Sequence, residues 1–451
     1  MSASASTPIA ALRESLAALG EGRLTATALV GQALQLAHAC NEAVNAFSLI
    51  ADRQAEDEAA QADRRYADGR AGPLEGLPIV VKDLIDTAGI ETRYGSRAYL
   101  GHVPAQDADV VRRLKDAGAV VIGKATTHEF AWGVTTSHDS FGDTRNPHDT
   151  TRIPGGSSGG TAAAIASGAV AAGLGTDTGG SVRIPAALCG VAGFKPTWGA
   201  LSTDGIFPLA PTLDHPGILG RSMDDVQLLA AALGMSASNG DSPQAARFGV
   251  ISFIAPVPLE SGVAAAFAGA LARVGRQFAC RELQTEGVFD GAFETFAGIV
   301  LAEGAMSHLA RSNWDWIVQH YGAETIQRLT LARAVTLGEY GNCLEARRRF
   351  IGRLDAAITG VDFLLLPTCP CVAPLLRQDD IVIGPWSGTA RRALMTYTSP
   401  FNLAGYPAIT LPIPQAPGLL PAGLQIVARP GEDGRLLQIA QTLESMLAAC
   451  S

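Results

Sequence analysis

Apolar and polar residues alternate with helical spacing over the first 70 residues. The segments IAALRESLAAL (9–19) and TALVGQALQLAHAC (27–40) place apolar side chains three and four positions apart, which predicts two amphipathic helices. The next segment, RQAEDEAAQADRRYADG (53–69), is rich in charge and predicts an exposed helix. The helical pattern returns further along the chain at 107–119, 161–173, 223–233, 265–274 and 434–447.

Short apolar runs separate these helices and predict buried strands. The first lies in LEGLPIVVKDLID (74–86) and ends at Lys82 and Asp83. Further strands are predicted at 120–123, 247–253, 361–367, 407–412 and 423–428, and a glycine-containing loop at 175–187. Because no linker or repeat divides the chain, residues 1–451 are predicted to form one large α/β domain. Its mixed central β-sheet is expected to be covered by helices on both faces, in an order that the pattern does not specify.

Composition narrows the class of protein. Hydrophobic residues make up 47% of the 451 residues and charged residues 17%, which excludes a disordered chain. The 34 basic and 43 acidic residues give a net charge of −9, so no nucleic-acid partner is expected. Seven scattered cysteines disfavour a disulfide scaffold and favour a reducing compartment. Without a signal peptide or an apolar membrane span, the sequence predicts a soluble cytoplasmic protein.

Glycine is concentrated between residues 154 and 193. That region holds eleven glycines, where 50 in 451 residues would give about four. Within it, residues 155–159 match the G-x-S-x-G nucleophile elbow with Ser157 as the nucleophile. The polar segment before the motif is not a buried strand, which disfavours this esterase-like interpretation. The elbow would also need a downstream histidine, for which the candidates are His215, His308 and His320.

The glycine-rich stretches also permit a phosphate cradle or simple turns. A phosphate cradle is disfavoured because the preceding strand and the G-K-[ST] ending are both missing. Tight turns beside small-residue helices would explain either glycine-rich stretch alone. They explain less well why two such stretches each carry a serine, at positions 157 and 181. No metal site is predicted, because the histidines lack metal-binding spacing and Cys369 and Cys371 form a lone pair.

Lysine is rare, and one lysine has an unusual setting. Only four of the 34 basic residues are lysines, at 82, 115, 124 and 195. Lys82 follows the apolar run LPIVV, where burial would lower its pKa and let the neutral amine act as a base for serine. The alternative is a strand-end lysine that extends to solvent or pairs with Asp83.

The stretch from Pro154 to Gly199 closely resembles the signature of the amidase signature family. The resemblance continues in LEGLPIVVKDLIDTAG around Lys82, in GKATTHEFAWG and TRNPHD, and in SPFNLAGYPAITLP. It implies the family's α/β fold, with an N-terminal helical segment (1–70), a catalytic core (73–220) and a remainder (221–451) that completes the sheet and the substrate pocket.

The resemblance also implies a Ser–cis-Ser–Lys catalytic triad. Ser181 matches the nucleophile, Ser157 the bridging serine after a cis peptide bond, and Lys82 the base. The family builds its oxyanion hole from backbone N–H groups of the nucleophile loop, which here correspond to Thr178, Gly179, Gly180 and Ser181. Glycines at 179 and 180 let successive N–H groups converge on one point, as such a hole requires.

Neighbouring residues are expected to support this triad. Ser158 is predicted to hydrogen-bond within its network, and Asp177 and Arg183 to hold the nucleophile loop. Lys124 and Lys195 are assigned structural roles. Trp132 fits either a core aromatic or a pocket-lining residue. Substrate choice is expected to depend on segments 303–349 and 381–397, whose aromatic residues favour an apolar pocket: Trp314, Trp316, Trp386 and Tyr397.

The resemblance therefore predicts an amidase that hydrolyses a small-molecule carboxamide through a Ser181 acyl-enzyme, without a cofactor or metal. A homodimer is a further expectation, since family members often form one. The alternative within the family is a glutaminase-type subunit of an amidotransferase complex. It is disfavoured because RRALMTYT (391–398) offers no acidic side chain for a glutamine amino group. A non-catalytic scaffold is disfavoured because all three triad positions are occupied by the expected residues.

Overall fold

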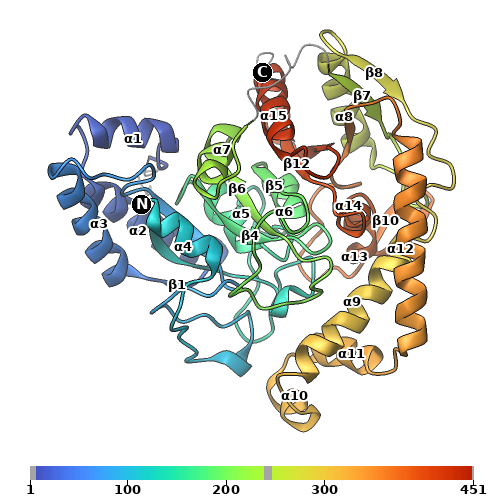
Figure 1. Ribbon diagram of the computed structural model, residues 1–451, viewed down its shortest axis with the longest axis horizontal. Coiled ribbons are helices and arrows are strands. Elements are labelled where there is room, and N and C mark those ends of the chain that lie inside the picture. Colours follow the sequence, from blue (N-terminus) through green and yellow to red (C-terminus); the bar gives the residue numbers. More distant parts are fainter. Residues whose placement is uncertain (1–6, 238–245, 449–451) are drawn as a thin grey trace.

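A mixed β-sheet runs through the middle of the protein (Figure 1), whose computed structural model describes residues 7–237 and 246–448. Within the described residues the sheet has eleven strands. Their order is β1 (Phe47–Ile50), β3 (Val120–Ala125), β2 (Pro78–Lys82), β4 (Ala172–Thr176), β6 (Pro216–Gly220), β5 (Ala192–Lys195), β12 (Ala408–Ile413), β13 (Ala422–Val427), β9 (Phe363–Pro367), β7 (Arg247–Val250) and β8 (Ala279–Glu282). Strand β2 is parallel to β3 and β4, and β7 to β8 and β9; the other pairs are antiparallel.

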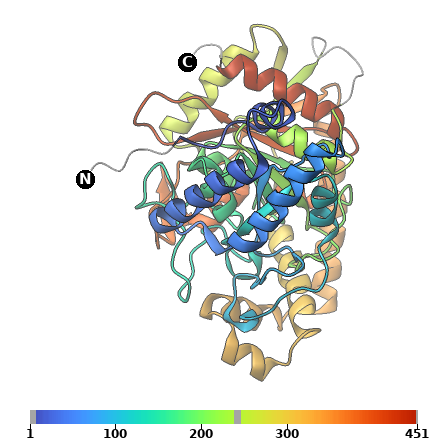
Figure 2. The same ribbon diagram turned by 90° about the vertical axis from the view of Figure 1, so that its left-hand side faces the viewer.

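Helices cover both faces of this sheet, which confirms the predicted fold class. The N-terminal helices α2 and α3 pack side by side near β3 (Figure 2), and α5 and α6 pack together on the central strands. Helix α15 contacts α7 and α8 over β6, β12 and β13. The helices of this part are α1 (Leu12–Gly20), α2 (Ala26–Val44), α3 (Asp52–Ala67), α4 (Asp109–Asp116), α5 (Gly159–Ala166), α6 (Arg183–Cys189), α7 (Met223–Ala232), α8 (Ser261–Val274) and α15 (Asp433–Ala448).

A second group of helices extends to one side of the sheet (Figure 1). It consists of α9 (Ala292–Leu309), α10 (Trp314–His320), α11 (Ala323–Ala332) and α12 (Leu337–Ala357). Helix α9 connects this group to the rest, since it contacts α11, α12, α13 and α14. The remaining elements are α13 (Ala390–Thr396), α14 (Ser399–Leu403), two short 3₁₀ helices, η1 (Arg97–Tyr99) and η2 (Glu129–Ala131), and the hairpin β10 (Asp380–Ile383) with β11 (Trp386–Thr389).

The predicted helix over 161–173 is wrong in its second half. The helix ends at Ala166, Gly168 turns the chain at a φ of +79°, and β4 begins at Ala172. The predicted loop over 175–187 likewise contains the start of α6 at Arg183. Small and apolar residues occupy this whole region, so periodicity alone could not separate helix from strand. The predicted strands at β2, β3, β7, β9, β12 and β13 are confirmed.

No described helix is both long and apolar enough to cross a membrane. The six described cysteines carry free thiols, and Cys450 lies outside the described residues. Cys369 and Cys371 are both buried, close behind the end of β9.

Candidate active site

Lys82 closes β2 and points into the protein interior. Its side chain is fully buried, and Nζ lies 2.7 Å from Ser157 Oγ and 2.7 Å from Thr176 Oγ1. Because β2 and β4 are parallel neighbours with Val81 opposite Leu174, the ends of both strands meet at one edge of the site. The alternative of a lysine that extends to solvent or pairs with Asp83 is therefore wrong.

Burial also changes the basicity of Lys82. Removal of the ammonium from water lowers its pKa to about 7, although the negative charges of Asp177 and Asp214 oppose the shift. A lysine in water has a pKa of about 10.4, so near neutral pH only about one in a thousand would be neutral. In this site a large fraction of the amine is neutral at pH 7 and able to accept a proton.

We expect kcat/KM to rise with pH as Lys82 loses its proton, with a midpoint near pH 7. The sign follows from the active form: the neutral amine prevails above the pKa and is lost below it, about tenfold per pH unit. A pH profile of amide hydrolysis checks this. Glu444 is the matched control, because burial raises its pKa to about 7 while it binds the backbone N–H of Met223. Glu444→Gln should keep the midpoint, and a profile that is flat through pH 7 would contradict the assignment.

Ser157 and Ser158 directly precede α5 in the sequence, and Ser158 contacts both β4 and the nucleophile loop. The Gly156–Ser157 peptide bond is cis. The Ser158 hydroxyl lies 3.2 Å from the Thr176 carbonyl oxygen and accepts the Thr176 N–H at 3.3 Å, while the Ser158 N–H donates to the Ser181 carbonyl at 3.1 Å. Ser158 thus connects the segment that carries Ser157 with the loop that carries Ser181.

Gly156 is required by the close packing at this point. A Cβ at this residue would lie 2.8 Å from Thr136 Oγ1 and 2.9 Å from the backbone carbon of Val134. Neither contact is compatible with ordinary van der Waals distances. Glycine therefore lets the Ser157 segment approach the chain at 134–136.

Ser181 lies in the loop between β4 and α6 and lines a narrow cavity. Its side chain is nearly buried, and among the described residues its hydroxyl makes no hydrogen bond. The structure thus brings Lys82 and Ser157 into direct contact and places Ser181 next to Ser158. The Ser181 hydroxyl is free to meet a substrate carbonyl that enters this cavity.

A buried ion pair holds the nucleophile loop. Asp177 and Arg183 are both fully buried, with Arg183 Nη2 2.9 Å from Asp177 Oδ1 and Nε 3.0 Å from Oδ2. Arg183 also donates to the Thr398 carbonyl, to Gln425 and to Asn402. Burial alone would raise the pKa of Asp177, but the positive charge and hydrogen bonds of Arg183 hold it below its ordinary value. Asp177 and Arg183 thus connect the loop before α6 with Thr398, Asn402 and Gln425.

The backbone donors of the nucleophile loop differ in one respect from the expectation. The Gly180 N–H donates to Asp177 Oδ1 at 2.8 Å and is therefore occupied. Among the described residues, the N–H groups of Thr178, Gly179 and Ser181 have no protein acceptor. Three of the four predicted oxyanion donors are thus available to a ligand.

The histidines do not support Ser157 as an elbow nucleophile. His215 Nδ1 lies 2.7 Å from the Leu213 carbonyl, and His308 Nδ1 lies 3.1 Å from the Tyr321 hydroxyl. His320 is exposed and contacts the Trp316 carbonyl. Within residues 7–237 and 246–448 no histidine side chain hydrogen-bonds to the Ser157 hydroxyl, whose partner is Lys82, and the backbone N–H of His128 reaches only the Ser157 carbonyl.

Trp132 lines the same cavity as Ser181, which places it in the pocket as well as in the core. Further side chains of the cavity are Leu209, Phe296, Val300, Met395 and Arg391. The cavity is not lined by Trp314, Trp316, Trp386 or Tyr397, whose contribution to an apolar pocket stays a prediction, although segment 381–397 supplies Arg391 and Met395 to it. Helix α10, which carries Trp314 and Trp316, lies at the outer end of the second helical group (Figure 1), and Tyr397 donates its hydroxyl to the Val257 carbonyl.

Sequence reasoning missed Thr176 and Asn402. Thr176 is the second partner of Lys82, and Asn402 donates to the Asp177 carboxylate at 2.8 Å. Thr176 ends β4, which is parallel to the strand β2 that carries Lys82. Its hydroxyl could have been predicted as a partner of Lys82 only if the order of the strands had been known. The other buried lysines act as cross-links: Lys124 donates to Thr87 and to further oxygen atoms, and Lys195 to the carbonyls of Pro196 and Tyr406.

Comparison with known proteins defines the class of this protein. The family model described as Amidase matches residues 28–437. A solved crystal structure of an amidase is 36% identical and superimposes with a TM-score of 0.90, covering 97% of this chain and 100% of the other. The chain therefore belongs to the amidase signature family, and it is a hydrolase of amide C–N bonds.

Two relatives show the range of the family around this chain. It is 36% identical to the A subunit of glutamyl-tRNA(Gln) amidotransferase from Symbiobacterium thermophilum, over 93% of each chain. It is 34% identical to the AtzE subunit of 1-carboxybiuret hydrolase from Pseudomonas sp. strain ADP, over 96% of this chain and 97% of the relative. Both relatives are named as subunits, which leaves a protein partner open for this chain.

Proposed function

We propose that the protein hydrolyses a small-molecule carboxamide through an acyl-enzyme on Ser181. The observation that carries the proposal is the contact of fully buried Lys82 with Ser157, in a site that also contains Ser181. A neutral lysine with a direct serine contact supplies the base that a serine nucleophile needs. In the described part of the chain, no other basic side chain hydrogen-bonds to the hydroxyl of Ser157 or Ser181.

The proposed reaction has two steps, acylation of Ser181 and hydrolysis of the acyl-enzyme. The Ser181 oxygen forms a bond to the amide carbon as its proton passes to Ser157, whose own proton passes to the neutral amine of Lys82. The negative charge on the carbonyl oxygen is stabilised by the N–H groups of Thr178, Gly179 and Ser181. The C–N bond then breaks, and the leaving amine takes the proton back along the same path. Water, deprotonated by the same relay, then attacks the Ser181 ester. The relay returns that proton to the Ser181 oxygen as the ester bond breaks and the carboxylic acid leaves.

Labelling with a fluorophosphonate tests this proposal. We expect a single covalent adduct in the mass of the intact protein. Peptide mapping of a digest should locate it on Ser181. The rate of labelling should fall by at least about a hundredfold in Lys82→Ala, because the serine then lacks its base. Lys195→Ala would not be a suitable control, since that buried lysine cross-links the fold. Lys115→Ala is the suitable control, because Lys115 lies away from the site, beside Asp107 and Glu58. An adduct on Ser157 would contradict the assigned roles.

A glutaminase-type subunit of an amidotransferase is the second candidate. It is favoured by the similarity to the amidotransferase relative over 93% of the chain. The narrow cavity beside Ser181 is lined by Met395 and contains, among the described residues, no carboxylate for a substrate amino group, whereas Glu324 and Asp379 line the pocket that adjoins it. Ammonia release by the isolated protein distinguishes the two: an amidase should prefer other primary amides to glutamine, whereas a glutaminase should prefer glutamine.

A further inference from the structure

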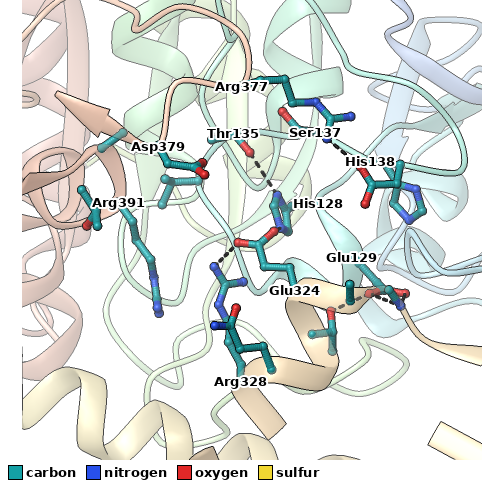
Figure 3. A pocket seen from close by; sticks show the side chains of 18 of the residues that line it. His128, Glu129, Thr135, Ser137, His138, Glu324, Arg328, Arg377, Asp379 and Arg391 are labelled. Atoms are coloured by element: carbon teal, nitrogen blue, oxygen red, sulfur yellow. Dashed lines mark hydrogen bonds and ion pairs between the residues drawn. The ribbon is translucent and has the colours of Figure 1, made fainter. Parts of the chain in front are cut away.

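A wide pocket of about 720 Å³ adjoins the narrow cavity at Ser181. Val134 and Arg391 line both spaces, so Arg391 lies where the two meet. Figure 3 shows the Arg391 side chain extending into the wide pocket from the segment just after β11, with Arg328 and Glu324 on α11 nearby. A substrate whose amide reaches Ser181 from the wide pocket must pass this guanidinium.

Most charged side chains of the wide pocket already have partners in the protein. Glu324 is bound by Arg328 and lies 3.0 Å from His128 Nε2. Arg377 pairs with Asp139 at 2.6 Å at the outer rim. Glu129 accepts the N–H of Gly322 at 3.0 Å and is also bound by Thr325. Arg328 keeps one buried nitrogen, Nη1, without a hydrogen-bond partner among the described residues, so it adds positive charge to the pocket beside Arg391.

Arg391 differs from them. In the part of the chain that the structure describes, its guanidinium makes neither a hydrogen bond nor an ion pair. Burial, together with the positive charge of Arg328, lowers its pKa to about 10. An unpaired, partly buried cation is unfavourable by itself, and a bound anion would remove that cost.

We propose that Arg391 binds a carboxylate of the substrate, so that the preferred substrates are amide acids with the carboxamide at Ser181 and the carboxylate at Arg391. This inference rests on the proposed hydrolysis at Ser181. A planar carboxylate matches the two parallel donors of a guanidinium. Phe296 and Met395 supply apolar contacts for the carbon chain between the two groups.

A matched substrate panel tests the inference. The panel pairs succinamate, glutaramate, adipamate and terephthalamate with the corresponding diamides, in which a second carboxamide replaces the carboxylate. For the amide acid whose length fits, we expect kcat/KM to exceed that of its diamide at least tenfold in the wild-type protein. In Arg391→Met that ratio should fall towards one, mainly through a higher KM for the acid. Arg391→Lys should keep part of the preference, because the charge remains.

Arg392 provides the matched control. It is the next residue on α13, but it pairs with Glu294 at 2.6 Å and does not line the wide pocket. Arg392→Gln should keep the wild-type ratio of acid to diamide.

A second measurement does not depend on turnover. Glutarate or adipate should slow the fluorophosphonate labelling of Ser181 in the wild-type protein and in Arg392→Gln, but not in Arg391→Met. Equal rates for acids and diamides, without protection by dicarboxylates, would overturn the role of Arg391 and leave hydrolysis at Ser181 standing. Absence of both hydrolysis and an adduct would instead overturn the proposed function, and the role of Arg391 with it.

Discussion

Ser181→Ala is expected to lower kcat/KM for amide hydrolysis by at least about 10⁴-fold. The variant removes a cavity-lining hydroxyl that has no partner among the described residues. Ser157 cannot replace it, because its oxygen is fully buried against Lys82. The fold should be unaffected, since no hydrogen bond of the described chain is lost with this hydroxyl. Steady-state kinetics and a thermal melt of the same preparation measure both effects.

Ser399→Ala is the matched control for this variant. Ser399 is likewise a buried serine, and its hydroxyl has no partner among the described residues. It lies at the start of α14 and outside the cavity. Its removal should change kcat/KM by less than about threefold, since no reacting atom is touched. Activity of Ser181→Ala within tenfold of the wild type would show that another group is the nucleophile.

Arg183→Met is expected to lower the free energy of unfolding by about 3–5 kcal/mol. The substitution leaves the Asp177 carboxylate buried without its cation, and it removes the donors to Thr398, Gln425 and Asn402. Because the same pair positions the nucleophile loop, activity should fall together with stability. Denaturant unfolding, followed by intrinsic fluorescence, measures the change.

Two further variants separate the buried charge from general damage to the core. Arg183→Met combined with Asp177→Asn should be more stable than Arg183→Met alone, because no unpaired charge then remains. Arg377→Met removes an exposed arginine that pairs with Asp139 and Asp143, and should cost less than about 1 kcal/mol. If Arg183→Met and Arg377→Met were equally stable, the buried pair would not hold the loop.

The local sequence pattern was sufficient to predict strands and burial where a residue's environment follows from its neighbours in sequence. The apolar run before Lys82 predicted strand β2 and made a desolvated amine one of two alternatives, and the structure has both the strand and the buried amine. Pattern failed at β4, β5 and β6, whose sequences AGLGT, AGFK and PGILG are short and contain glycine. These strands are stabilised by pairing with distant segments, which no local window contains.

The site residues divide in the same way. Ser157 and Ser181 were found through the resemblance to a family, because both lie in one continuous signature sequence, residues 154–199. Thr176 required the register of β2 against β4, and Arg391 required a cavity formed by segments more than 200 residues apart. Neither arrangement is encoded in spacing along the chain.

Lys82 lies 75 residues from Ser157 and 94 from Thr176 in sequence, and the three meet only across paired strands. Before β2 and β4 pair, Lys82 is solvated and protonated, with the basicity of any free lysine. In the proposed mechanism the newly made chain therefore lacks a base for Ser181 and does not hydrolyse amides, its own peptide bonds included. If Ser181 is the nucleophile as proposed, it becomes reactive only when the interior closes, and its labelling by a fluorophosphonate then also reports completed folding.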